Sequence, residues 1–144
     1  MEKHFATYNQ SLALKELGFD ESCFGKFNYL KKLEISYCLE NTCGYDKHKN
    51  SLTLKGSYGN GIVACSAPLK SQVFEWARKE HQIEVTVACF YSKRLGISYE
   101  ERQYHCHIVR DGVTTKGPKF KTYEEAESAL IDKLIEIIKN NLDK

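Results

Sequence analysis

Apolar residues spaced three or four positions apart predict two helices in the first 81 residues. The first begins at Thr7, because Thr7 and Gln10 have the spacing of a capping box, and Gly18 is suited to end it. The second begins near Pro68, a residue favoured in a first helical turn. The apolar positions of this second helix share one face: Leu69, Val73, Trp76 and Ala77.

A third helix is predicted at the C-terminal end of the chain. Thr122 and Glu125 again have the capping-box spacing, and early glutamates suit the positive end of a helix dipole. The stripe that follows is broad: Ala126, Leu130, Leu134, Ile137 and Ile138, widened by Ile131 and Ile135. That breadth indicates burial on more than one side or contact with a partner, and a homo-oligomer formed through this helix is one such contact.

Alternation of apolar and polar residues predicts strands on both sides of the second helix. Three strands lie at 83–91, 99–110 and 113–121, and Asp111-Gly112 is a strong hairpin signal between the last two. Gly117-Pro118 marks a bulge or an edge in the last strand. The N-terminal half carries shorter strands around a polar loop and a glycine-rich turn: 23–29, 33–38, 52–54 and 62–64, with the turn at 56–61.

These elements predict one α+β domain over residues 1–144, built on an antiparallel sheet with the three helices packed mainly on one face. The C-terminal half has the order helix, three-strand meander, helix. The chain has 144 residues, 42% of them apolar and 28% charged, which is ordinary for a globular protein. No repeat, low-complexity segment or interdomain linker interrupts it.

Net charge and the absence of apolar segments limit the possible locations and partners of the protein. The formal net charge of +2 excludes a strongly basic coat for nucleic acid but leaves room for a local basic patch. No apolar run approaches the roughly 20 residues of a membrane span, and the first residues lack a signal peptide. We therefore expect a cytoplasmic protein without membrane contact, in which the six cysteines remain thiols.

The basic patch has its best candidates near the end of the meander. His105 and His107 project to one strand face, and two imidazoles at this spacing suit an anion, a metal or a pH sensor. Alternation places Arg102 and Arg110 on the opposite face, so a joint patch requires a bulge or twist. A half-exposed sheet face with solvated lysines is the alternative. The full candidate set for a ligand or anion patch is Arg102, His105, His107, Arg110, Lys116, Lys119 and Lys121.

Metal and catalytic signatures are weak. Cys38, Cys43 and His48, with Cys65 as a fourth ligand, are the nearest approach to a zinc set, but they lack a close C-x2-C pair. The alternative is a loop beside unrelated thiols, and no cofactor is expected. No nucleophile elbow, zincin motif or dinucleotide fingerprint occurs, so we assign no catalytic residue and expect a binding module before an enzyme.

The order from Pro68 to Leu142 resembles the double-stranded-RNA-binding domain in topology. That family places basic residues at the start of its last helix, where they meet phosphate. Here the corresponding segment, 122–127, carries three glutamates. The resemblance therefore supplies the fold and no RNA-binding residues.

Three short segments resemble small uncharacterised proteins from phages and mobile elements of gut bacteria: residues 13–20, 67–76 and 123–127. The resemblance implies an accessory protein that acts in the cytoplasm of a host cell. It favours a non-enzymatic protein that binds a host protein or a signalling nucleotide, with a counter-defence role. A nucleic-acid-binding module and a small enzyme with a spatially assembled site are the alternatives.

Overall fold

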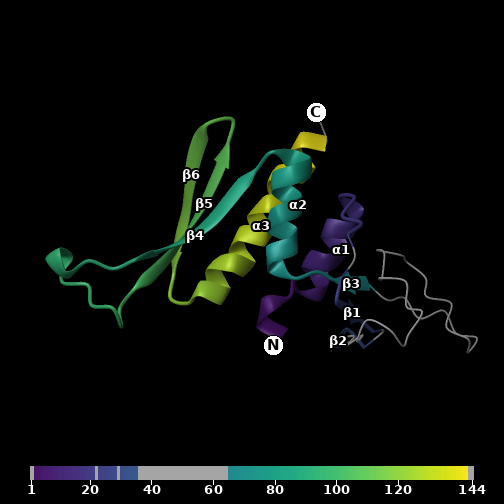
Figure 1. Cartoon of the computed structure of the whole chain (residues 1–144), viewed down its shortest axis with the longest axis horizontal. Helices are drawn as coiled ribbons and strands as arrows, with labels where there is room; N and C mark the ends of the chain where they lie inside the picture. Colours follow the sequence, from purple (N-terminus) through teal and green to yellow (C-terminus); the bar gives the residue numbers. More distant parts are fainter. Residues whose placement is uncertain (1, 22, 29, 36–64, 143–144) are drawn as a thin grey trace, which may run out of the picture. The chain divides into compact units, whose positions relative to one another are not determined.

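In a computed structural model, the chain divides into two compact units, Met1–Gln72 and Val73–Lys144 (Figure 1). The structure describes residues 2–21, 23–28, 30–35 and 65–142. Within them, helices accompany two three-stranded antiparallel sheets, so the predicted α+β class is confirmed. The boundary between the units falls inside helix α2 (Lys70–His81), where the sequence has no change of composition.

The first unit begins with a short 3₁₀ turn, η1 (Glu2–His4), and helix α1 (Tyr8–Glu16). The predicted capping box is confirmed, because the Gln10 amide donates to Thr7 Oγ1 at 3.3 Å and the Thr7 amide donates to Gln10 Oε1 at 3.0 Å. Gly18 follows α1 with a φ of +90°, a left-handed conformation that ends the helix as predicted.

The sheet of the first unit has the order β2-β1-β3, with β1 (Gly25–Phe27), β2 (Leu33–Ile35) and β3 (Cys65–Ala67). A Cβ atom on Gly25 would lie 2.9 Å from the Phe5 ring, so the packing of this small core requires glycine there. The predicted strands at 52–54 and 62–64, the turn at 56–61 and the end of 33–38 lie outside the described residues.

The second unit confirms the predicted helix, three-strand meander, helix order. After α2 come β4 (Glu84–Phe90), the 3₁₀ turn η2 (Lys93–Leu95), β5 (Gln103–Arg110), β6 (Val113–Phe120) and α3 (Tyr123–Leu142). The sheet order is β4-β5-β6, with both neighbouring pairs antiparallel. Asp111 and Gly112 have φ values of +51° and +76°, as the tight hairpin turn between β5 and β6 requires.

Helix α3 contacts all three strands of this sheet from one side (Figure 1). The predicted cap is confirmed, since the Glu125 amide donates to Thr122 Oγ1 and the Thr122 amide donates to Glu125 Oε2. The broad apolar stripe is buried within the chain: Ala126, Leu130, Ile131, Leu134, Ile135 and Ile138. Neither α3 nor another helix in the described ranges has an apolar stretch long enough to cross a bilayer.

Candidate functional site

Alternate side chains of β5 point to opposite faces of the sheet. Cys106 and Ile108 are buried, and the Cys106 thiol donates to the Ala126 carbonyl oxygen of α3 at 3.0 Å. His105 and His107 therefore project to the face that α3 does not cover, as the alternation predicts. This side of the β4-β5-β6 sheet, opposite α3, is called the open face below.

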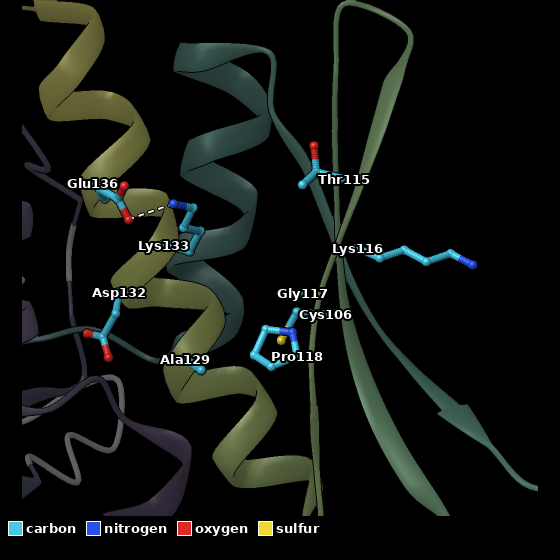
Figure 2. Close-up of a pocket in the computed structure, with 9 residues that line it drawn as sticks. All are labelled: Cys106, Thr115, Lys116, Gly117, Pro118, Ala129, Asp132, Lys133 and Glu136. Atoms are coloured by element: carbon cyan, nitrogen blue, oxygen red, sulfur yellow. Dashed lines mark hydrogen bonds and ion pairs between the residues drawn. The ribbon is translucent and has the colours of Figure 1, made fainter.

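Strand register gives each histidine a lysine neighbour on β6. His105 pairs with Lys119 and His107 pairs with Lys116, although the two lysines are three positions apart and a regular strand would place them on opposite faces. The ladder has a bulge between His105 and His107, where β6 carries one extra residue. The bulge predicted at Gly117-Pro118 is thus what places both lysines on one face, and Figure 2 shows Lys116 directed away from α3.

On the other side of β5, the register with β4 brings an aromatic ring to the open face. Phe90 pairs with Gln103 and is 39% exposed, and its ring centroid lies 6.1 Å from that of His105. The His105 and His107 centroids are 6.5 Å apart. Together the open face consists of three residue rows: Glu84, Thr86, Ala88 and Phe90 on β4; Gln103, His105, His107 and Val109 on β5; Thr114, Lys116 and Lys119 on β6.

The electrostatic environment of the open face is positive. The pKa of His105 is lowered by its partial burial and then by the charges of Lys119, His107 and Lys116. The lysines therefore supply the fixed positive charge near neutral pH, while the His105 imidazole remains mostly uncharged. Glu84, at the far corner of this face, is neutralised by the Arg78 guanidinium, whose Nε lies 2.8 Å from Glu84 Oε2.

The two predicted arginines lie elsewhere, so the seven candidate residues do not form one patch. Arg110 donates to Asn141 of α3 at 2.8 Å, and Arg102 donates to the Tyr104 hydroxyl at 2.7 Å. Arg110 thus contacts α3, and Arg102, which precedes β5, is bonded to a residue of the α3 side of that strand. Lys121 is exposed, lies directly after β6 and is not part of the open face.

Arg102 organises a second surface, the tyrosine–arginine cluster. Its guanidinium lies 4.3 Å from the Tyr99 ring centroid, and the Tyr99 ring meets that of Tyr91 at 5.6 Å. Tyr104 meets Tyr123, the first residue of α3, at 5.9 Å. Tyr91, Tyr99 and Tyr123 are each exposed by 44% or more, a composition typical of protein contact surfaces.

A groove of about 490 Å³ lies between β6 and α3 (Figure 2). It exists because Gly117, Pro118 and Ala129 are small where the strand and helix face each other. Cys106 at its floor is no activated nucleophile, since burial raises the pKa of its thiol and the thiol donates to a backbone carbonyl. The Lys133–Glu136 ion pair at 2.7 Å occupies the helix wall, so the lining of this groove contains no nucleophile–base pair.

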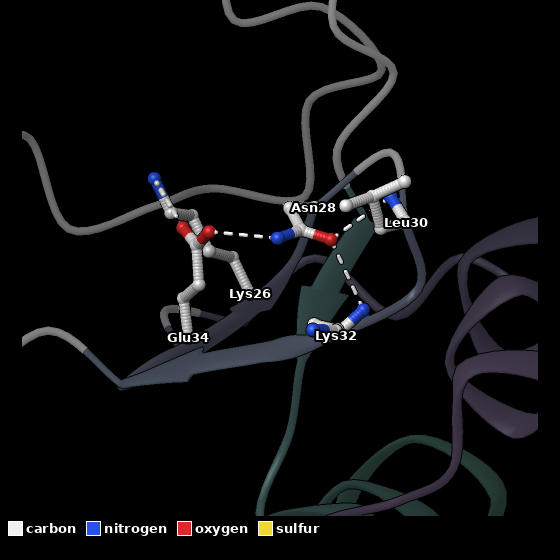
Figure 3. A network of polar contacts seen from close by, with 5 residues as sticks. All are labelled: Lys26, Asn28, Leu30, Lys32 and Glu34. Carbon is white, nitrogen blue, oxygen red and sulfur yellow. Dashed lines mark hydrogen bonds and ion pairs between the residues drawn. The ribbon is translucent and has the colours of Figure 1, made fainter.

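A polar network in the first unit surrounds Asn28 (Figure 3). Asn28 Oδ1 accepts from the amides of Leu30 and Lys32 at 2.9 and 3.0 Å, and its Nδ2 donates to Glu34 at 2.9 Å. The pKa of Glu34 is lowered first by the Asn28 hydrogen bond and then by Lys26, which is 3.3 Å away. These bonds close the β1–β2 turn on itself, so the network stabilises a hairpin and presents no converging groups to a ligand.

The zinc hypothesis obtains no support from the described part of the chain. Cys38, Cys43 and His48 lie outside it, and Cys65 is a buried free thiol in β3, with a pKa raised by burial. Within the described residues, no group of three or more His, Cys, Asp or Glu side chains could hold a metal ion. Among the described residues, Cys23, Cys65, Cys89 and Cys106 form no disulfide.

The N-terminus of α3 carries carboxylates at the position where the double-stranded-RNA-binding domain, which the order of elements resembles, has basic residues. Glu125 occupies the cap by bonding back to the Thr122 amide, and Glu124 adds a second carboxylate to the first turn. Phosphate would meet negative charge where that family supplies lysines.

Phe90 and Gln103 are residues of the open face that the sequence did not identify as candidates. Alternation along the strand could have identified Phe90. It is an odd number of positions from the buried Val85 and the partly buried Val87, so it lies on the opposite side of β4, which is the open face. Its proximity to His105, however, depends on the β4–β5 register. Comparison with models of protein families, with curated proteins and with solved structures finds no match to this chain, so the functional argument rests on the geometry of the open face.

Proposed function

We propose that the protein is a non-enzymatic binding module whose open face binds nucleotide units, either as a free signalling nucleotide or within a nucleic acid strand. One observation carries this proposal. The bulge in β6 aligns Lys116 and Lys119 with the two histidines of β5 on the open face, beside the ring of Phe90. Phosphate and a planar base are the two groups that such a surface recognises together.

The physical basis is charge and stacking on a rigid support. Lys116 and Lys119 each offer a positive charge to a phosphate group. Glu84, the acidic residue of β4 on the open face, is already paired with Arg78 and so does not compete for these lysines. A base stacked on an aromatic side chain contributes about 1–3 kcal/mol and tolerates any base identity. Since these groups project from hydrogen-bonded strands, little ordering is required when the ligand binds.

Equilibrium binding tests the proposal directly. Fluorescently labelled ATP and a labelled thymidine octamer are titrated at low and at moderate salt, with anisotropy as the signal. We expect at least one probe to bind at low salt, and the Lys116→Gln/Lys119→Gln variant to bind about tenfold or more weakly. Lys133→Gln is the matched control, because Lys133 lies on α3 in an ion pair away from the open face. Absence of binding by both probes at low salt, or equal losses in both variants, would reject the proposal.

The tyrosine–arginine cluster supports a second function, contact with a host protein. Its exposed tyrosines around a fixed guanidinium have the composition of an interface centre. This candidate agrees with the accessory role that the resemblance to phage proteins implies. A partner retained by the wild type and by Lys116→Gln/Lys119→Gln, but lost by Tyr91→Ala/Tyr99→Ala, would assign the contact to this cluster. Equal retention by all three proteins would exclude the cluster.

A further inference from the structure

We infer that the ligand of the open face is a single nucleic acid strand, held across two successive nucleotides, and not one free nucleotide. The inference rests on the proposed function and narrows its ligand class. Three observations support it: the repeated lysine–histidine pairs, the shallow shape of the surface, and the aromatic rings, which can stack only on an unpaired base.

The open face contains the same cation–imidazole pair twice. Lys119 stands beside His105 and Lys116 stands beside His107, and the two imidazole centroids are 6.5 Å apart. This matches the rise of about 7 Å over two residues of a strand. A single phosphate group would be served best by lysines converging on one point, whereas the backbone of a nucleic acid strand presents one phosphate per nucleotide at regular intervals. The repetition therefore fits a repeating anion.

The shape of the surface also favours a polymer. Thr86, Lys116 and Lys119 are exposed and His105 and His107 are half-buried, so a ligand on this face keeps one side in solvent. Small ligands are usually enclosed in a cavity that buries most of their surface. A strand compensates for shallow contacts by extending over several residues, and each added nucleotide contributes both a phosphate and a base.

The aromatic groups require bases that are not stacked in a duplex. Phe90 and His105 can meet a base only through a free ring face, which a paired and stacked base does not offer. The acidic first turn of α3 separately removes the site that the related duplex-binding topology uses. Both observations select a single strand over a double helix.

A length series tests the inference. Labelled oligothymidylates of one, two, four and eight nucleotides, the matching oligouridylates and a duplex of the octamer are titrated against the full chain. We expect affinity to increase by about tenfold or more from one nucleotide to four, and the duplex to bind more weakly than either single strand. The oligouridylate arm shows whether RNA or DNA is preferred.

The salt dependence of binding tests whether each of the two lysines contacts one phosphate. The slope of log affinity against log salt should decrease by about 0.7 for Lys116→Gln, by the same for Lys119→Gln, and by their sum in the double variant. Phe90→Ala should weaken binding by roughly 5- to 150-fold with the slope unchanged, because stacking releases no counterions. Lys133→Gln should leave affinity and slope as in the wild type, and thermal melts should show that all variants remain folded.

The outcomes separate the two proposals. If the mononucleotide binds as tightly as the octamer and both need the lysines, the strand inference fails and the nucleotide-binding function stands. Tighter binding of the duplex than of the single strand also overturns the inference. If no probe binds at low salt, both proposals fail together.

Discussion

The two faces of β5 differ in burial and in chemistry. Cys106 and Ile108 are buried on the α3 side, whereas His105 and His107 alternate with them along the strand and lie on the face that carries two lysines. One strand thus supplies the core and the candidate site by simple alternation. The comparison teaches that core residues and candidate site residues occupy neighbouring positions of one strand, so a substitution can be directed at either set alone.

The separation depends on strand register. A slip by one residue would exchange the faces, bury the imidazoles and expose the apolar side chains. Two local features prevent it: the Asp111-Gly112 turn, with both residues at positive φ, and the bulge opposite Cys106. These features therefore determine which side chains lie on the open face.

The largest effect is expected for a core truncation on the α3 side. Ile108→Ala should lower the free energy of unfolding by about 2–5 kcal/mol, because it leaves a cavity against α3. Val109→Ala, on the half-buried open face of the same strand, should cost under about 1 kcal/mol. Urea unfolding followed by circular dichroism measures both, and equal losses would show that the two faces are not distinct in packing.

The next effect concerns the bulge. Gly117→Ala would place a Cβ atom 3.0 Å from Cys106 Cβ, a contact so close that Cys106 or β6 must move by a few tenths of an ångström. We expect a loss of about 1–3 kcal/mol in unfolding free energy, together with weaker binding if the shift turns Lys116 from the open face. Thr114→Ala, an exposed change on the same strand, should stay within about 0.5 kcal/mol of wild type. An unchanged Gly117→Ala protein would mean that the strand tolerates a side chain at the bulge.

Local signals predicted much of this fold. Both capping boxes, the left-handed Gly18, the Asp111-Gly112 turn and the bulge near Gly117 each depend on a few neighbouring residues, and each is confirmed. The alternation of β5 also correctly separated the histidines from Arg102 and Arg110. Such features have their causes within a short window of sequence, so a single sequence suffices to find them.

Features that depend on distant partners could not be predicted. The division into two units falls inside α2, where neither composition nor turn residues change. The approach of Phe90 to His105 requires the register between strands separated by a 12-residue connection, and the bond from Arg110 to Asn141 spans 31 positions. Pairing across such distances is decided by packing of the whole unit, which alternation along one strand does not contain.

A pH series on the open face should give a moderate effect. The pKa of His105 is lowered by partial burial and by Lys119, His107 and Lys116, while Ala88 and Phe90 on β4 add no charge. An anion bound beside the ring favours its protonated form, so affinity should increase as pH falls below the ordinary histidine value of 6.5. His105→Gln should flatten that increase. An octamer without terminal phosphates is the probe, since its diesters do not titrate in this range, and an equal increase in the variant would exclude His105.

The smallest effect is expected for His81→Gln. This variant tests whether the pH dependence of stability is independent of the pH dependence of binding at the open face. Burial lowers the pKa of His81, its ring lies 4.6 Å from that of Trp76, and its buried Nε2 has no hydrogen-bond partner among the described residues. Because the unfolded chain binds a proton more readily than the folded one, the stability contributed by neutral His81 is present above pH 6.5 and decreases as pH falls below it. His81→Gln should weaken this pH dependence of the unfolding free energy and leave the pH dependence of binding as in the wild type, whereas His105→Gln should change the pH dependence of binding. If His81→Gln altered the binding profile instead, protonation on the helix side and recognition on the open face would be coupled, and the separation of the two faces would be wrong.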